Sequence, residues 1–375
     1  MRHTFFATCG PGIEPVLHAE CKALRLAKTE RQVGGVRFEG SMADARRACL
    51  QLRTAVRVRR WLLRFPCPDG DALYRGVSGL DWSAFVHPEG TLVVDALSSD
   101  SALTHTQFVE QRAKDAIVDQ MRARTGARPS VDKSNPDLRV HVHLFRDRAT
   151  VAVDCGGASL HKRGWRVHQG RAPLAETYAA ALVLMSGWNQ RAPLLDPFCG
   201  SGTILIEAGL LAGGVAPGLF RERFGFESWS DHDARAWERE CAAARAAIAH
   251  PKKLRLIGRD HDPERVEEAR ENAASAGLDE RIEFEVGDAR DMELKPGWNA
   301  WLVTNAPYGA RVGEGDEIEG VLESLGERLR SEAEGYHVAA LLGEKRHEGR
   351  LGLRGAQRTM LRNGSLRVRL YQAQV

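Results

Sequence analysis

The sequence predicts an α/β protein whose C-terminal half forms a doubly wound parallel sheet. From residue 192 onward, short apolar runs typical of strands alternate with amphipathic segments typical of helices. The stretch at 192–202, APLLDPFCGSG, reads as a short buried strand that ends at Asp196 and turns through Gly200 and Gly202 into an apolar helix. Smaller α/β units are expected before it, since 375 residues suffice for two or three domains.

The first unit is predicted over residues 1–65 as a ferredoxin-like domain. The expected order is a strand at 4–8, a helix after the GPG at 10–12, a strand at 36–39, a helix at 42–52 and a strand at 55–65. The last strand carries Arg57, Arg59 and Arg60. These arginines could touch RNA, but a solvated face is the interpretation that we prefer.

The second unit is predicted over residues 66–160. Alternating or helical apolar spacing indicates a strand at 92–96, a helix at 107–124, and strands at 138–145 and 149–154. His141 and His143 share one face of a strand. We assign them no metal, and expect none elsewhere, because no third ligand accompanies the pair.

A basic connector is predicted over residues 161–173. Lys162, Arg163, Arg166 and Arg171 surround Trp165, and such a mixture of cations with an aromatic ring is typical of sites for single-stranded nucleic acid. A charged connector that is pinned by one buried tryptophan explains the pattern equally well.

The last domain is predicted over residues 174–375. A helix at 176–185 leads into the glycine turn. Strands are then expected at 254–257, 282–286, 301–304, 338–342 and 366–370, with helices around 237–248, 266–273 and 318–329.

Charge distribution and cysteine content indicate the kind of partner and the cellular compartment. Residues 1–170 carry 26 Lys and Arg against 18 Asp and Glu, a balance of +8, and the remaining residues carry 27 against 32, a balance of −5. A polyanion docking on the front portion would explain the asymmetry, as would an arginine-rich composition. Seven cysteines without a CxxC pair suit a reducing cytosol, and we expect a soluble, cytoplasmic protein, because no 18-residue apolar stretch or signal peptide is visible.

Acidic residues follow three predicted strands in succession. Asp196 precedes the glycine turn, and an acid there suits a cationic ligand, for which S-adenosylmethionine is the cofactor that fits. Asp260 is placed to accept from ribose hydroxyls, and Asp288 to accept from an adenine amine. Asp262 is expected to cap the helix that begins at Pro263 instead.

The fourth strand end carries the sequence Asn305-Ala306-Pro307-Tyr308. Methylation of an exocyclic amine requires that the nitrogen lone pair be freed from ring conjugation. The side-chain oxygen of Asn305 and the carbonyl of Ala306 can accept the two amine hydrogens, and Tyr308 can stack on the base. Catalysis would come from positioning and hydrogen-bond acceptance, without a covalent nucleophile. Cys199, in the cofactor turn, is assigned to packing.

Taken together, these motifs resemble the THUMP-domain RNA guanine-N2 methyltransferases, and most closely their bacterial 23S ribosomal RNA branch. The resemblance covers nearly the whole chain and rests on DPFCGSGTILIEA, NAPYGARVG, SLHKRGWR with APLAET, FATCGPGIEPVL, KDAIVD and RPSVD. It implies a ferredoxin-like region, a THUMP RNA-binding domain over 66–160 and a Rossmann-like methyltransferase domain that uses S-adenosylmethionine.

The resemblance also assigns roles by position. The methionine part of the cofactor would be held by Asp196, Pro197, Gly200 and Gly202, the ribose by Asp260 and the adenine by Asp288. The target base would be received by residues Asn305 to Tyr308, of which Asn305 also lies beside the cofactor. The family usually has Asn-Pro-Pro-Tyr at this turn, and this chain has Ala306 at the second position. Its carbonyl is retained and Pro307 still favours an extended Ala306, so we expect slower turnover at most. The lost preorganisation is on the order of 0.4–1 kcal/mol.

Three alternatives stay open at the level of the sequence. The substrate could be transfer RNA instead of ribosomal RNA, or the reaction could be methylation of adenine N6 in DNA or RNA. A non-catalytic RNA-binding assembly factor is the alternative from another class, and Ala306 is its only support. Members of the family often carry a second methyltransferase domain on the same chain. We expect any partner methyltransferase of this chain to be a separate protein. The oligomeric state is not predicted.

Overall fold

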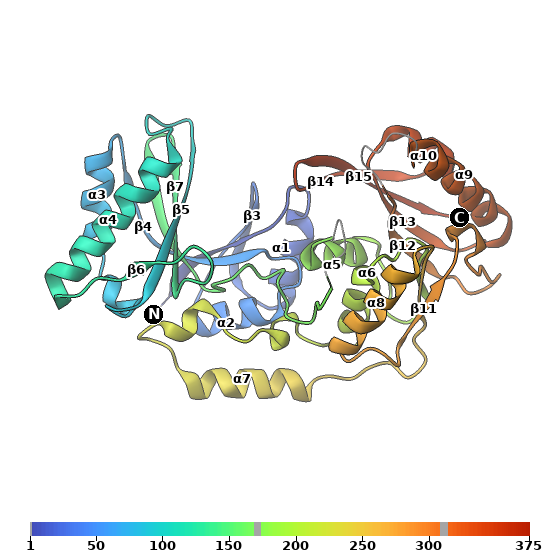
Figure 1. Cartoon of the computed structure of the whole chain (residues 1–375), viewed down its shortest axis with the longest axis horizontal. Coiled ribbons are helices and arrows are strands. Elements are labelled where there is room, and N and C mark those ends of the chain that lie inside the picture. The colour runs from blue at the N-terminus through green and yellow to red at the C-terminus, as the bar shows by residue number, and fades with distance from the viewer. Residues whose placement is uncertain (1, 169–173, 308–313) are drawn as a thin grey trace.

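The computed structural model describes residues 2–168, 174–307 and 314–375, the side chains of residues 314–317 excepted. Figure 1 shows an elongated molecule in which two sheets lie along the long axis. We call residues 2–168 the front half, with the front sheet, and residues 174–375 the back half, with the back sheet.

The first elements of the front half confirm the ferredoxin-like prediction. They are β1 (His3–Thr8), α1 (Glu14–Ala23), β2 (Ala27–Gln32), β3 (Gly35–Gly40), α2 (Met42–Gln51) and β4 (Arg57–Pro66). Their strands are antiparallel in the order β2-β3-β1-β4. Helix α2 begins with a capping box in which Ser41 and Asp44 exchange hydrogen bonds. Strand β2 was not predicted, because AKTERQ is an edge strand without an apolar alternation.

The second part of the front half extends the same sheet. Its elements are α3 (Gly70–Ser78), the 3-10 helix η1 (Trp82–Ala84), β5 (Thr91–Ser99), α4 (Thr106–Thr125), β6 (Ser130–Val131), β7 (Leu138–Phe145) and β8 (Arg148–Asp154). Strand β8 pairs with β4, so that the described strands of the front half form one sheet in the order β2-β3-β1-β4-β8-β7-β5-β6. Helix α3 was missed by the sequence analysis. The two predicted units are therefore joined by the pairing of β4 with β8.

The back half confirms the doubly wound prediction. Its elements are α5 (Glu176–Met185), β9 (Leu194–Asp196), α6 (Thr203–Ala212), η2 (Pro217–Phe220), η3 (Gly225–Ser228), α7 (Ala234–Ala246), β10 (Leu256–Asp260), α8 (Pro263–Ser275), β11 (Ile282–Val286), η4 (Ala289–Asp291), β12 (Trp301–Asn305), α9 (Glu314–Glu332), β13 (His337–Leu342), α10 (Lys345–Leu351), β14 (Gln357–Asn363) and β15 (Leu366–Gln374). The described strands follow the order β11-β10-β9-β12-β13-β15-β14. Strand β14 and helix α10 were not predicted.

The strand order of the back sheet defines where a ligand can sit. Strands β9 to β13 are parallel, and the chain moves from β9 outward to β10 and β11 before it returns to β12 on the other side of β9. The crevice between β9 and β12 is therefore the topological switch point, at which ligands of such sheets bind. The carboxyl ends of β9, β10, β11 and β12 meet along this edge.

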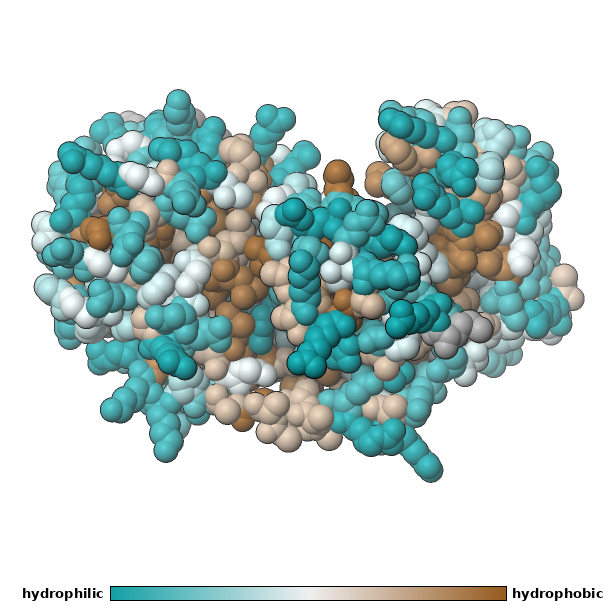
Figure 2. All heavy atoms as spheres, turned by 180° about the vertical axis from the view of Figure 1, so that it is seen from behind, coloured by the Kyte–Doolittle hydropathy of each residue, from teal (hydrophilic) through white to brown (hydrophobic). Residues whose placement is uncertain are grey.

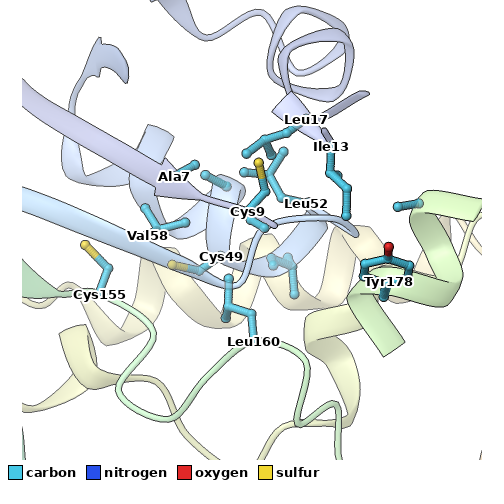
Figure 3. Packing of buried hydrophobic residues seen from close by; sticks show 14 of the residues in the cluster. Ala7, Cys9, Ile13, Leu17, Cys49, Leu52, Val58, Cys155, Leu160 and Tyr178 are labelled. Atoms are coloured by element: carbon cyan, nitrogen blue, oxygen red, sulfur yellow. The ribbon is translucent and has the colours of Figure 1, made fainter. Parts of the chain in front are cut away.

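One hydrophobic core joins the two halves. Residues 176–183 of α5 are buried and the helix packs against the front half; Figure 3 shows Tyr178 of this helix on the side that faces Ile13. In the same view Cys49 and Cys155 approach each other beneath Val58. The front half and the site in the back half are therefore held in one packed unit.

A segment of the back half also reaches across to the front half. Trp229 packs edge-on against Phe85, with 5.3 Å between the ring centroids, and Arg60 forms an ion pair of 3.2 Å with Asp231. Farther along, Arg46 pairs with Glu240 of α7, which Figure 1 shows along the lower edge of the molecule. We call residues 224–240 the clasp. Arg60 is thus engaged within the protein. The sequence analysis preferred a solvated face for this residue, and the structure does not place it on one.

Candidate functional site

The glycine turn after β9 is shaped by two residues with positive φ. Gly202 has φ +81°, and a Cβ there would lie 2.9 Å from the ring of Phe284, so glycine is required for helix α6 to start this close to the sheet. Gly200 has φ +50°, and no heavy atom lies within 4 Å of the position of its Cβ. The turn thus leaves open space beside its main chain, as a pocket for a ligand requires.

Asp196, the last residue of β9, is buried at 1% exposure. Its Oδ1 accepts hydrogen bonds from the hydroxyl of Thr304 at 2.6 Å and from the N–H of Phe198 at 3.2 Å. Burial raises the pKa of this carboxyl from 3.8 to about 7. A cation placed beside it would favour the carboxylate, so the local chemistry fits the sulfonium and ammonium groups of S-adenosylmethionine.

The other two acidic strand ends lie next to this turn. Asp260 ends β10, and its Oδ2 accepts from the N–H of Gly200 at 2.9 Å, which ties it to the glycine turn. Gly287 donates to the carbonyl of Asp260, which brings Asp288 to the same edge. Asp288 caps η4 and is held by Arg290, whose hydrogen bond to the carboxyl lowers the pKa of Asp288. The roles of Asp260 and Asp288 toward ribose and adenine stay predictions.

Asp262 behaves as the sequence analysis expected. It is the N-cap of α8, and its side chain accepts from the N–H of Glu264 at 2.9 Å. It therefore builds the helix start. Cys199 is buried, and burial raises the pKa of its thiol well above the usual range, which suits a packing role.

Asn305 ends β12, and its position is set by the pairing of β12 with β9. Its Oδ1 is buried and has no hydrogen-bond partner among the described residues. Since a buried acceptor without a partner costs about 1–3 kcal/mol, such an atom in a folded protein calls for an explanation. Ala306 is fully buried and Pro307 is exposed, while Tyr308 lies outside the described residues.

The connector requires a correction. Arg163 is 2% exposed and donates to Glu207 and to the carbonyls of Leu160 and Arg53. Arg166 is also turned inward. The prediction that Arg163 and Arg166 contact RNA is therefore wrong for this structure, because both guanidinium groups are already engaged inside the protein. Lys162 is exposed, and Arg171 lies outside the described residues.

Arg166 instead supports the cofactor turn. It donates to Glu176 at 2.7 Å, to the hydroxyl of Thr203 at 2.9 Å and to that of Ser201 at 3.4 Å. Asn272 of α8 adds a bond from its side-chain amide to the carbonyl of Ser201 at 3.1 Å. The sequence analysis missed Thr304, Asn272 and this role of Arg166. Only Thr304 could have been found, from its place before Asn305, since the others depend on tertiary packing.

Helices that could cross a lipid bilayer, being both long and apolar enough, do not occur in the part of the chain that the structure describes.

Family models match the chain in three places. Residues 163–372 match the model described as RMKL-like, methyltransferase domain, residues 68–154 match the THUMP domain, and residues 4–59 match the RlmL ferredoxin-like domain. The three matches follow the order of the elements described above, and the first spans more than half of the chain.

Curated relatives and solved structures agree with these matches. "Ribosomal RNA large subunit methyltransferase K/L" of Syntrophotalea carbinolica is 40% identical over 98% of this chain and 53% of its own length, so the chain spans about half the length of such relatives. The crystal structure of SMU.472 complexed with SAH has a TM-score of 0.89 at 30% identity, covering 100% of this chain and 98% of that one. A predicted N6-adenine-specific DNA methylase from Listeria monocytogenes has a TM-score of 0.88 at 29% identity, covering 99% and 96%. The chain therefore belongs to the RMKL-like methyltransferase domain family, and it carries a THUMP domain and an RlmL ferredoxin-like domain in its front half.

Proposed function

We propose that this chain is an S-adenosylmethionine-dependent enzyme that methylates the N2 amine of a guanine in structured RNA, with 23S ribosomal RNA as the substrate. The observation that carries the proposal is the buried Oδ1 of Asn305, which has no partner among the described residues and lies at the switch point of the sheet. An amine hydrogen of a target base would supply the missing partner. We infer the ribosomal substrate from the relative in Syntrophotalea carbinolica, which is a ribosomal RNA large subunit methyltransferase by name.

The pocket beside the glycine turn supports the cofactor. S-adenosylmethionine, when bound, supplies a methyl group on a positively charged sulfur. Asp196 offers a buried carboxyl that a cation would ionise, and Gly200 leaves the main chain open for close approach. Asp260 and Asp288 are the acceptors that we assign to ribose and adenine, and Pro197 and Gly202 shape the turn. The complex of SMU.472 with SAH, in a chain of the same fold, supports the choice of cofactor.

The four residues from Asn305 to Tyr308 would receive the target base. Asn305 accepts one amine hydrogen and the carbonyl of Ala306 accepts the other, which turns the nitrogen lone pair toward the methyl group. The base must leave its stack to reach this strand end. Transfer would leave a positive charge on the nitrogen, which the amine loses as a proton to solvent afterwards. No side chain has to remove a proton beforehand, because the hydrogen bonds to the amine hydrogens favour the pyramidal, nucleophilic nitrogen.

The test is transfer of labelled methyl from S-adenosylmethionine to 23S, 16S and transfer RNA, followed by identification of the methylated nucleoside by mass spectrometry. We expect N2-methylguanosine in 23S RNA. N2-methylguanosine in transfer RNA alone would show that transfer RNA is the substrate. N6-methyladenosine as the product would show that the target base is adenine and not guanine. Binding of the cofactor without transfer to any of the three RNA classes would contradict the proposal.

Asp196 makes the affinity for the cofactor depend on pH. Its pKa of about 7 means that the carboxyl is largely protonated below pH 7, so a cationic ligand must expel a proton to pair with it. We expect the affinity for S-adenosylmethionine to rise by up to about tenfold per pH unit below 7 and to level off above it. Calorimetric titrations from pH 5.5 to 8.5 measure this, and parallel profiles for Asp196→Asn and the natural chain would contradict it.

The same shift changes the stability of the ligand-free protein. Because the folded pKa lies above the unfolded one, the folded state binds more protons between about pH 4 and 7, and stability falls as the pH rises through that window. Asp196→Asn removes this dependence. We expect the variant to be more stable than the natural chain at pH 8, with the difference shrinking toward pH 4, as thermal melts across this range can show.

A further inference from the structure

A concave surface on the front sheet lies away from the candidate site. It is a groove of about 910 Å³ on the sheet face opposite the helices, formed by side chains of β1, β3, β4, β5, β7 and β8 and by the β2–β3 hairpin. Alternate residues of these strands pack against the helices, so the groove residues form the other face. Figure 2, a view from behind, shows a notch in the upper outline beside the lobe at the right, which holds α3, α4, β5 and β7 of the front half.

Every charged residue that lines the groove is an arginine: Arg37, Arg59, Arg64 and Arg148. Arg37 is paired with Glu30 and Glu39. The other three have no ion-pair partner among the residues that the structure describes. Unpaired cations in a concave surface without an acidic lining residue attract a polyanion.

A β-bulge places one of these arginines. The register between β4 and β8 shifts between Trp61 and Leu63, so that one extra residue is inserted into β4. Without the bulge, strict alternation from Arg59 and Trp61 would turn Leu63 into the groove and Arg64 toward the helices. The bulge reverses this, because Arg64 lines the groove and the next residue, Phe65, packs against the core.

Aromatic rings lie between the arginines. Phe6 and Trp61 are neighbours across β1 and β4, with ring centroids 6.2 Å apart, and the rings of His143 and Phe145 are nearly parallel, with centroids 6.5 Å apart. Phe145 is 40% exposed. His141 lines the floor of the groove; burial lowers its pKa to about 3, so that its ring is neutral. The groove thus offers flat, uncharged rings at intervals between fixed cations.

We propose that this groove binds an unpaired segment of RNA, with bases stacked on Trp61 and Phe145 and phosphates held by Arg59, Arg64 and Arg148. Aromatic platforms within a cationic groove are the chemistry that recognises single strands. A duplex hides the faces of its bases, so the rings would gain nothing from it. The choice of RNA over DNA rests on the proposed function. It also moves the RNA contact from the connector, where Arg163 and Arg166 are buried, to the front sheet.

The test uses a fluorescent 12-nucleotide RNA of uridine and cytidine only, which contains no guanine or adenine to methylate. Binding to the full chain is followed by fluorescence anisotropy. We expect Phe145→Ala to weaken binding by roughly 5- to 100-fold. Phe108→Ala is the matched control, because Phe108 is 44% exposed but lies on α4, on the other side of the front sheet. The affinity of the Phe108→Ala variant for the RNA should match that of the wild-type protein.

Salt dependence tests the arginines. Losing one phosphate contact should lower the slope of log affinity against log salt by about 0.7 for a single strand. We expect this change for Arg64→Ala and not for Arg122→Ala, an exposed arginine of α4. Equal effects of the groove and control variants, or binding of the same strand as a duplex with the same affinity and the same response to Phe145→Ala, would overturn the proposal.

The outcome is separable from that of the proposed function. Because the oligonucleotide carries no target base, its binding does not depend on methyl transfer. Failure of the groove variants to weaken binding, with transfer to 23S RNA intact, would overturn the groove assignment alone. Weakened binding of the groove variants, with no transfer to any RNA class, would support the groove and overturn the proposed activity.

Discussion

Replacing Asn305 with alanine is expected to slow methyl transfer by roughly 10²- to 10³-fold, the size of effect seen when one preorganised hydrogen-bonding group is removed from a reacting centre. The same change should leave the protein as stable as before, or more stable. The buried Oδ1 has no partner among the described residues, so alanine removes an acceptor that costs free energy in the absence of substrate. Single-turnover transfer and thermal melts measure the two effects.

Two measurements separate this role from a structural one. The affinity for S-adenosylmethionine should change little in Asn305→Ala, because the contacts of Asp196 and of the glycine turn are retained. Thr304→Val is the matched control: it removes the 2.6 Å hydrogen bond to Asp196 from the adjacent position. We expect it to alter cofactor affinity and its pH dependence. A loss of stability in Asn305→Ala together with normal transfer would contradict the assigned role.

Replacing Arg163 with methionine is expected to lower the free energy of unfolding by about 3–5 kcal/mol, because the buried Glu207 would lose its ion-pair partner and keep only the nearby guanidinium of Arg53. Arg163 is 2% exposed and Glu207 is fully buried, with 3.2 Å between Nε and Oε1. The arginine also joins the connector to the carbonyl of Arg53 in the front half. Urea unfolding followed by tryptophan fluorescence gives the change.

The neighbouring residue provides the control. Lys162 is exposed, so Lys162→Met should change stability by no more than about 0.5 kcal/mol. Replacing both Arg163 and Glu207 with apolar residues, as Arg163→Met with Glu207→Leu, should recover most of the loss, since a buried ion pair can often be exchanged for packed side chains. A double variant as unstable as Arg163→Met alone would show that the pair is not the cause.

The sequence was most informative where a residue type has few structural alternatives. The role of Gly202 in the turn could be predicted because only glycine fits there: the structure gives it a positive φ and a close contact with Phe284. The acidic strand ends could be predicted to lie together because parallel strands end at one edge of the sheet. Elements without an apolar pattern were missed, such as β2 with the sequence AKTERQ. Helix α3 was missed because it is only nine residues long and follows a turn-rich stretch.

The features that could not be predicted depend on contacts between residues far apart in the sequence. Arg163 has the composition of an exposed connector residue, and only the fold brings Glu207 to it. Asn305 was chosen for the chemistry of its amide, whereas the absence of a partner for Oδ1 depends on every residue around it. The bulge in β4 has no local signal either, although it decides which side of the sheet Arg64 faces.

The clasp has a consequence for synthesis of the chain on the ribosome. Arg60 and its partner Asp231 are 171 residues apart, so the front half emerges long before the residues that cover Phe85 and Arg60. At about 5–20 residues per second, this interval lasts on the order of 10–30 seconds. During that time the nascent front half exposes an aromatic surface that the finished protein hides.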